Sequence, residues 1–338
     1  MQTIVECPKR MRYGPCGGVR DDSSCEVDAR PCPFAQEPAA VVAWDGPPAA
    51  GRAPRSRLLE AAQRGPVVLT DLTVPAYDAG GVRRVVERLA GSCDAVLLGE
   101  HQDRPDLPPT AMAALVGEAG GVSWTTLACR DRNRVVLEQE LAGLALAGAD
   151  GVLCVTGDAR APGVRPGVTQ VFDLDGTRLA AMAAEAGHAV AVPEAPGAAP
   201  RHLRPARLVE KQRAGAHLAV LNHVGTAAEV AAFVAAAREL GLRVPVVAGV
   251  AVYTDERSAR VLQRFPGLHL DGERVEAVLG ASDVREAGIE EAVREARALL
   301  AVEGVAGVNL SGLASSAGAL DGAAVKAEVG ARIREGQR

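Results

Sequence analysis

Eight short apolar segments, separated by stretches with helical periodicity, follow one another from about residue 57 to the end of the chain. We expect strands at 67–74, 95–99, 123–129, 151–156, 189–193, 218–222, 246–252 and 307–310. A strand of a parallel sheet that is buried on both faces has a continuous apolar run instead of an alternating pattern. Eight such strands alternating with helices over about 280 residues suit an α/β fold of the (β/α)8 TIM barrel type.

The helical segments support the same architecture. In the segment 134–146, Leu137, Leu141 and Leu144 share one face. Similar patterns cover 227–240, 274–280, 289–300 and 323–334. A doubly wound open sheet is the alternative, but no Gly-x-Gly-x-x-Gly follows any expected strand. The long stretch between the seventh and eighth strands predicts either a decorated surface, or a lid or oligomer contact.

The composition excludes several classes of protein. The chain has 338 residues, 48% of them hydrophobic, and a net charge of -5, which allows a substantial core. The sequence has no stripe of Lys and Arg of the kind that indicates a nucleic-acid binder. It also has no uncharged apolar run long enough to span a membrane. Residues 1–12 carry charges and lack the apolar core of a signal peptide. We therefore expect a cytoplasmic protein, and we expect it to form a homo-oligomer.

Four of the seven cysteines, Cys7, Cys16, Cys25 and Cys32, lie close together at the start of the sequence. In a reducing compartment such clusters more often bind metal than form disulfides. Four thiolates suit Zn²⁺ or a [4Fe–4S] cluster equally well. Because the segment has few large apolar residues, we expect a bound metal to supply its folding energy.

These features divide the chain into three parts. Residues 1–34 are expected to form a cysteine-rich metal-binding module, and 35–56, rich in Ala and Pro, a linker. Residues 57–338 are expected to form the barrel. Its three cysteines fall in or beside expected strands, where core packing is the default interpretation.

Polar side chains gather where the expected strands end. Catalytic groups of a TIM barrel project from the carboxyl ends of its strands. The residues found there are Asp71, Thr73, Glu100, Thr126, Arg130, Asp131, Asn133, Asp158, Glu194, Asn222, His223, Tyr253 and Asn309. Some of them have simpler interpretations: Asn133 and Asp131 could cap a helix, Arg130 and Asp131 could form an ion pair, and Asp158 could form a turn or a cap.

Several of these residues belong to a longer pattern. It comprises Cys129-Arg-Asp-Arg-Asn133 after the third expected strand, Thr156-Gly-Asp158 after the fourth, then Phe172-Asp-Leu-Asp175, Pro193-Glu194 and Glu210-Lys211. This pattern resembles the 5,10-methylenetetrahydrofolate reductase family over essentially residues 66–312. The resemblance implies a (β/α)8 barrel that binds a tetrahydrofolate-type small molecule. It also implies hydride transfer from NAD(P)H or a reduced electron carrier through FAD or FMN.

The resemblance assigns roles to residues of this chain. Catalysis falls to Asp71 as the proton donor and Asp158 as the carboxylate that stabilises a cationic intermediate. The residues expected to bind the cofactor are Thr126, Arg130, Asp131, Asn133, Thr156, Gly157, Asp158 and Lys211. Those expected to bind the substrate are Glu194, Asn222 and His223. An apolar strand before Asp71 favours a protonated acid, whereas Gly157 and nearby backbone donors favour an ionised Asp158.

The amino-terminal segment Cys7-Pro-Lys-x-Met-x-x-Gly-Pro-Cys16-Gly-Gly-Val resembles a second element of the same family. It is similar to the small cysteine-rich carboxyl-terminal domain of these reductases. It also resembles the partner subunit of reductases in anaerobic one-carbon pathways. That resemblance implies an iron–sulfur cluster and a redox partner protein. Here the element precedes the barrel.

Departures from the family pattern leave three functions open. Thr126 replaces a histidine that contacts flavin, Asn222 replaces a substrate-contacting glutamine, and Arg204 and Arg207 replace side chains that grip the FAD tail. The leading hypothesis is reduction of 5,10-methylenetetrahydrofolate, or a related iminium, to the methyl form. The alternatives are a tetrahydrofolate-dependent one-carbon transferase or demethylase without redox chemistry, and a non-catalytic iron–sulfur electron-transfer or docking subunit.

Overall fold

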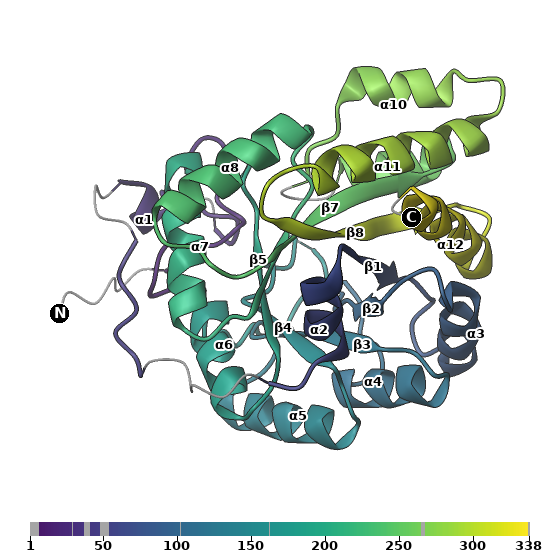
Figure 1. Ribbon diagram of the computed structural model, residues 1–338. Coiled ribbons are helices and arrows are strands. Elements are labelled where there is room, and N and C mark those ends of the chain that lie inside the picture. Colours follow the sequence, from purple (N-terminus) through teal and green to yellow (C-terminus); the bar gives the residue numbers. More distant parts are fainter. Residues whose placement is uncertain are drawn as a thin grey trace.

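Eight parallel strands close into a barrel in a computed structural model that describes residues 7–28, 30–36, 41–47, 54–101, 103–161, 163–264 and 268–336. Each strand pairs with its sequence neighbours, and β1 pairs with β8 to close the barrel (Figure 1). The strands are β1 (Val67–Leu72), β2 (Ala95–Leu98), β3 (Ser123–Ala128), β4 (Gly151–Val155), β5 (Val190–Glu194), β6 (Leu218–Leu221), β7 (Val246–Tyr253) and β8 (Val305–Ala314). The predicted TIM barrel and all eight predicted strands are confirmed.

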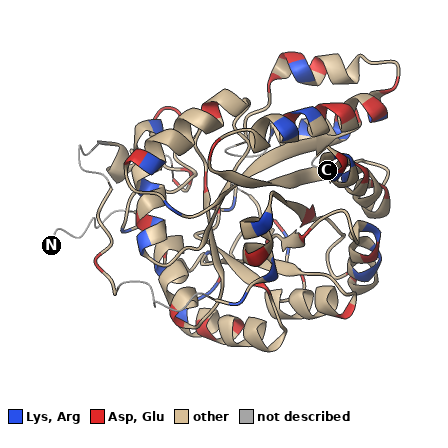
Figure 2. Cartoon of the chain, viewed as in Figure 1, with Lys and Arg blue, Asp and Glu red and all other residues tan. Residues whose placement is uncertain are grey.

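Helices surround the barrel and connect successive strands (Figure 1). They are α2 (Arg57–Arg64), α3 (Ala79–Leu89), α4 (Pro109–Glu118), α5 (Arg134–Leu146), α6 (Gly176–Glu185), α7 (Arg204–Arg213), α8 (Ala227–Glu239), α9 (Glu256–Gln263), α10 (Gly272–Leu279), α11 (Val284–Leu300) and α12 (Ala319–Glu335), with short α1 (Pro33–Gln36) in the amino-terminal segment. Within the described residues, no helix is long and apolar enough to cross a membrane. Basic and acidic residues are mixed along outer helices such as α11 (Figure 2).

The core has two layers that follow the alternation of side chains along each strand. Leu69, Trp124 and Val220 fill the barrel interior, whereas residues of opposite parity, such as Val68 and Leu127, pack against the helices. This parity decides which strand-end residues face the interior.

Helix α2 covers the amino-terminal end of the barrel, where Leu58 joins the interior layer. The Asp150 carboxylate holds this helix in place. It accepts hydrogen bonds from Ser56 Oγ (2.8 Å), the Arg57 amide (2.7 Å) and Trp124 Nε1 (2.9 Å). The Asp150 side chain therefore connects the start of α2 to Trp124, the most buried aromatic ring of the interior.

The connection between the seventh and eighth strands is the main addition to the barrel. Strands β7 and β8 continue their pairing to Tyr253 and Ala314, with register shifts, so both extend past the predicted ends. Helices α9 and α10 pack on this extension around Tyr253, Leu262 and Val275, in a small apolar cluster of their own. The two helices predicted in this connection, 274–280 and 289–300, are confirmed as α10 and α11, whereas α9 was not predicted.

The cysteine-rich segment lies against the barrel. Its apolar residues Met11, Val19, Cys32 and Phe34 form one cluster, and Ala199 and Leu203 of the barrel pack against it. The segment therefore shares a core with the β5–α7 region, as expected for a module with too few apolar residues to build its own. Residues 1–6 and 29 of the predicted module, and 37–40 and 48–53 of the predicted linker, lie outside the described residues.

Candidate functional site at the barrel mouth

Strand parity turns Asp71, Thr126, Asn222 and Asn309 toward the interior at the carboxyl end of the barrel. Each is two residues from an interior residue or lies between two residues of the outer layer. Strands β1 and β4 are three positions apart in the closed eight-stranded order, nearly opposite one another. The two predicted catalytic carboxylates, Asp71 after an interior position of β1 and Asp158 after β4, therefore approach the mouth from opposite sides.

Asp71 is held by partners from two other elements. Asn309 Nδ2 on β8 donates to Asp71 Oδ1 (2.8 Å) and to Ser311 Oγ (3.0 Å). On α12, the buried Lys326 ammonium donates to the Asp71 carbonyl oxygen (2.8 Å). Burial lowers the pKa of Lys326 to about 8, although the Asp71 carboxylate opposes this shift. Because Asn309 donates to it, Asp71 Oδ1 acts as a hydrogen-bond acceptor.

The loops after β3 and β4 are joined by a buried arginine. Arg130 is 3% exposed and donates to Asp131 Oδ2 (3.0 Å), to the Asp158 carbonyl (3.3 Å) and to the His101 carbonyl (2.9 Å). Arg160 pairs with the other oxygen of Asp131 (2.7 Å). The ion pair between Arg130 and Asp131 is therefore present, and Arg130 holds three strand-end loops together.

Asp158 follows Gly157, whose φ of 89° lies in the left-handed region that favours glycine. A Cβ on Gly157 would lie 3.1 Å from Arg130 Cβ, so the turn also needs the small residue. The Asp158 residue reaches solvent, but its surroundings desolvate the carboxyl group and raise its pKa, against the attraction of Lys9 and Arg130. The expectation that this environment favours the anion is wrong in direction, because desolvation outweighs the nearby positive charges.

Two predicted cofactor-binding residues have structural partners. Asn133 is the N-cap of α5 and accepts from the Val136 amide (3.0 Å), as its alternative interpretation proposed. Thr156 Oγ1 accepts from the Gly176 amide (2.9 Å), at the start of α6. Both side chains therefore stabilise the starts of helices.

Glu194 and Lys211 form a buried pair on the outer side of β5. Glu194 has the parity of Val190 and Val192, which belong to the outer layer. Lys211 Nζ lies 2.8 Å from Glu194 Oε2, and Arg204 Nη1 lies 3.5 Å from Oε1. Burial opposes ionisation of Glu194, but Lys211, Arg204 and Arg207 outweigh it and lower its pKa. The pair thus points away from the interior that Asp71 and Asn309 face.

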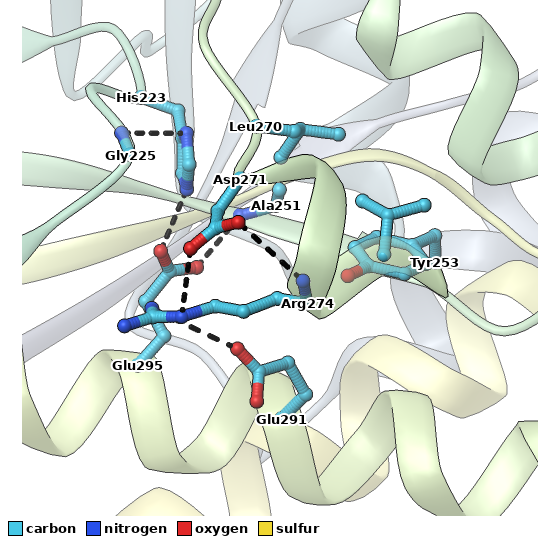
Figure 3. A pocket seen from close by; sticks show the side chains of 10 residues that line it. His223, Gly225, Ala251, Tyr253, Leu270, Asp271, Arg274, Glu291 and Glu295 are labelled. Carbon is cyan, nitrogen blue, oxygen red and sulfur yellow. Dashed lines mark hydrogen bonds and ion pairs between the residues drawn. The ribbon is translucent and has the colours of Figure 1, made fainter. Parts of the chain in front are cut away.

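His223 lies beside the mouth, in a hollow between β7, α10 and α11 (Figure 3). Its Nε2 is 2.6 Å from Glu295 Oε1, and its Nδ1 is 2.5 Å from the His269 carbonyl oxygen. Burial opposes protonation, but Glu295 and the His269 carbonyl together raise the pKa of His223. The hollow has a cavity volume of about 10 Å³, which is room for about one water molecule. Through its contact with Glu295, His223 connects α11 to the loop after β6.

The four amino-terminal cysteines are free thiols that lie near one another. Cys7 and Cys16 pack against the apolar cluster that contains Cys32, and Cys7 also interacts electrostatically with Cys25 and Cys32. Burial raises the pKa of Cys16 to about 11. In the described part of the chain, no three Cys, His, Asp or Glu side chains are arranged closely enough to hold a metal ion. Four thiols have the donor chemistry of a metal site. In this structure they lie near one another but do not form a coordination shell.

Sequence reasoning missed the residues through which the cysteine-rich segment contacts the mouth. Lys9, 2% exposed, forms an ion pair with Glu26 and donates to the Gly157 carbonyl oxygen (2.7 Å). Glu26 also accepts from the Ala159 amide (3.0 Å). Lys9 and Glu26 each lie within two residues of a cysteine, but no local pattern showed that they would contact the loop after β4.

Comparisons with known proteins concern two parts of the chain, the amino-terminal segment and the barrel. A family model described as the methylene-tetrahydrofolate reductase C terminal matches residues 2–42. A search of curated proteins finds no match.

A solved structure shares the barrel fold, and a second is similar at a lower score. One is an uncharacterized protein from Clostridium thermocellum that binds two copies of 5-methyl-5,6,7,8-tetrahydrofolic acid; its TM-score is 0.59 at 12% identity over 80% of this chain and 98% of that one. Tryptophan synthase from M. tuberculosis has a TM-score of 0.47 at 16% identity, over 83% of this chain and 100% of that one. Such low identities show the fold alone. The protein is thus a (β/α)8 barrel preceded by a segment that matches the methylene-tetrahydrofolate reductase C-terminal family model.

Proposed function

We propose that this protein is a folate-dependent one-carbon enzyme that binds a tetrahydrofolate derivative at the carboxyl end of the barrel. One observation carries the proposal: the reductase-family segment contacts the β4 loop at Gly157 and Ala159. The contact of the family-specific element with one loop of the polar barrel mouth supports a shared site. The barrel protein that binds methyltetrahydrofolate has a similar fold, which is compatible with such a ligand.

The reaction we propose is reduction of 5,10-methylenetetrahydrofolate to 5-methyltetrahydrofolate. A proton is transferred to one of the two nitrogens that flank the methylene carbon, and that carbon–nitrogen bond breaks to leave an iminium cation. A hydride from NAD(P)H then adds to the carbon; with a reduced electron carrier as the donor, two electrons from the carrier and a proton from solvent would complete the same reduction. This step needs one protonated acid and one carboxylate that stabilises the cation.

The surroundings of the two carboxyl groups suggest how they share these tasks. The raised pKa of Asp158 suits a proton donor. Asp71, which accepts a hydrogen bond from Asn309, suits the carboxylate that faces the cation. This assignment reverses the one that the sequence suggested, and it predicts that both residues are needed for turnover.

The side chains expected to hold a flavin do not fit that task. Asn133 caps α5, Thr156 binds the start of α6, and Lys211 pairs with Glu194 outside the interior. We therefore derive no step through a flavin. Because Asn133, Thr156 and Lys211 already have structural partners, a second candidate is favoured. This is a tetrahydrofolate-dependent one-carbon transferase or demethylase that needs no flavin.

We also propose that Cys7, Cys16, Cys25 and Cys32 hold Zn²⁺ or a [4Fe–4S] cluster. The support is the donor set: four free thiols in one segment, three of them around a single apolar cluster. A metal held there would supply folding energy to the segment. Elemental analysis of the purified protein should find Zn or Fe in near-stoichiometric amount.

Ligand binding and absorbance distinguish these functions. Anaerobically purified protein is titrated with methyltetrahydrofolate, followed by calorimetry, and its visible spectrum is recorded. Binding together with oxidation of NAD(P)H by methylenetetrahydrofolate supports the reductase. Binding without any reduction favours the transferase or demethylase. Absence of folate binding, with a cluster band alone, contradicts the proposal and favours an electron-transfer or docking subunit.

A further inference from the structure

A buried lysine lies behind Asp71, and the reaction proposed above gives it no task. Lys326 belongs to α12, which packs against α3, α11 and β8 (Figure 1). The residue is 2% exposed. Among the residues that the structure describes, no carboxylate forms an ion pair with its ammonium, whose partners are a carbonyl and a hydroxyl group. A buried charge without a counter-ion costs free energy, so its place here points to a role other than stability.

The partners of this ammonium lie at the end of β1. Lys326 Nζ donates to the Asp71 carbonyl oxygen (2.8 Å) and lies 3.4 Å from Thr73 Oγ1. The pairing of β1 with β8 ends one residue before Asp71, at Thr70. Thr73 Oγ1 also donates to the Gly312 carbonyl oxygen of β8 (3.3 Å). Lys326 therefore holds the main chain at the point where the β1–β8 pairing stops.

Asp71 is thus held at two places. Asn309 Nδ2 donates to its carboxylate oxygen Oδ1 (2.8 Å), whereas Lys326 binds its main-chain carbonyl from α12. A cavity of about 10 Å³ is lined by Asp71, Thr73 and Lys326, and the other residues that line it, such as Val85, are uncharged. This volume holds about one water molecule, so bulk solvent does not screen the ammonium.

We propose that Lys326 is a positioning residue for Asp71: it fixes the end of β1 through the Asp71 carbonyl, so that the carboxylate is held facing the cationic intermediate. Lys326 itself lies in the barrel wall and acts only through Asp71. A hydrogen bond from a charged donor is about twice as strong as one from a neutral donor, so the protonated lysine holds this carbonyl better than a neutral amine would. The inference rests on the proposed reduction, in which Asp71 stabilises the cation.

The charge of Lys326 changes in an accessible pH range. Burial lowers the pKa of Lys326 to about 8, and Asp71 on β1 and Cys93 before β2 are the titratable groups that interact with it. Burial raises the pKa of Cys93 to about 11, so this thiol is uncharged near pH 8. Helix α3, strand β8 and the rest of α12 contribute only uncharged residues to the cavity. The hold of Lys326 on Asp71 therefore weakens as the pH rises through the pKa of the lysine.

An NMR titration of the free protein tests this contact without any turnover. The protein is labelled with [13C]aspartate, and the Asp71 signals are assigned by their absence in Asp71→Asn. We expect the Asp71 carbonyl signal of the wild type to shift with a midpoint near the pKa of Lys326, and Lys326→Met to abolish this step. A wild-type signal without the step, or a step that persists in Lys326→Met, would overturn the inference.

Turnover kinetics test whether Lys326 acts through Asp71. In Lys326→Met we expect kcat for methylenetetrahydrofolate to fall by about 10–100-fold, the scale of loss when a catalytic group is misplaced. KM should stay within about twofold of wild type, because Lys326 does not bind substrate. In the Asp71→Asn background the same substitution should lower kcat by less than about twofold, because the group that it positions is gone. An equal loss in both backgrounds would overturn the inference.

The matched control is Arg285→Gln, which also removes a positive charge next to α12. Arg285 pairs with Asp321 at the start of that helix, and 46% of the Arg285 side chain is exposed. We expect kcat of this variant to equal that of the wild type. A loss as large as in Lys326→Met would assign the effect to charge around α12 in general and overturn the role of Lys326.

Urea unfolding separates positioning from support of the fold. An apolar side chain of similar length avoids the desolvation cost of a buried charge, so Lys326→Met should not lower the urea midpoint at neutral pH. Loss of stability together with loss of turnover would overturn the inference. A wild type that shows the NMR step but does not reduce methylenetetrahydrofolate contradicts the proposed function, while the hold of Lys326 on Asp71 stands.

Discussion

Glu194→Gln should strongly destabilise the protein, because in the described part of the chain Glu194 is the carboxylate that pairs with two buried cations, Lys211 and Arg204. Glu194 is 3% exposed, with Lys211 Nζ at 2.8 Å and Arg204 Nη1 at 3.5 Å. With an effective dielectric constant of about 20, each contact attracts by about 5–6 kcal/mol. The substitution also removes the desolvation cost of the carboxylate, so the net loss is smaller, about 3–5 kcal/mol for a broken buried pair.

Thermal and urea unfolding measure this effect. For a chain of this size, about 2 °C of Tm corresponds to 1 kcal/mol, so we expect Tm to fall by about 6–10 °C. The control is Glu303→Gln, which breaks an ion pair with Arg238 in which the Glu303 side chain is 95% exposed; it should cost less than about 1 kcal/mol. Adding Lys211→Met to Glu194→Gln should recover part of the loss, because one uncompensated cation is removed.

A small effect would refute the reasoning. If Glu194→Gln lowers Tm by no more than the Glu303 control, the buried cations are not held by Glu194. The electrostatic description of the β5–α7 region would then be wrong. Absence of recovery in the double variant would show that the loss comes from packing and not from charge.

Three further perturbations have defined outcomes. Asp71→Asn should lower turnover by about 10²-fold or more, because it removes the carboxylate that stabilises the cation, with methyltetrahydrofolate still bound in calorimetry, whereas Asp71→Glu should keep activity; full turnover of Asp71→Asn would exclude the reductase mechanism. The raised pKa of His223 means that its protonated contact with Glu295 contributes full stability below about pH 6.5. This contribution is lost as pH rises through the folded-state pKa, so His223→Gln should flatten the stability profile measured by urea unfolding in that window. Asp150→Ala should cost about 2–4 kcal/mol, since it leaves Ser56, the Arg57 amide and the Trp124 indole without their acceptor; a cost below about 1 kcal/mol would contradict the role of Asp150.

Local patterns were sufficient for the barrel. Apolar runs located all eight strands, and helix α5 begins and ends at the predicted residues, Arg134 and Leu146. Its N-cap, Asn133, is also a local feature, since the side chain binds an amide three residues away. Strand ends were less accurate where tertiary pairing prolongs a strand, as in β8, which continues to Ala314 through its pairing with β7.

The candidate site depended on contacts that no local pattern contains. Glu194 was expected to bind substrate, but it lies one residue out of phase with the interior positions of β5 and so faces α7. His223 was expected at the mouth, yet its partner Glu295 lies 72 residues further along the chain. Parity and distant partners decide such roles, because a shift of one residue turns a strand side chain to the opposite face.

The sequence by itself determined the barrel, the cysteine-rich segment and the polar residues at the strand ends, because strand and helix formation follow from hydrophobic periodicity over short windows. Only the tertiary structure decided that this segment contacts the β4 loop, where Lys9 reaches a carbonyl 148 residues away. It also decided that Glu194 is buried with Arg204 and Lys211, and that Arg204 donates to the Cys16 carbonyl oxygen. The physical reason is closure of the barrel. Burial and charge balance arise only when strands distant in sequence are brought side by side.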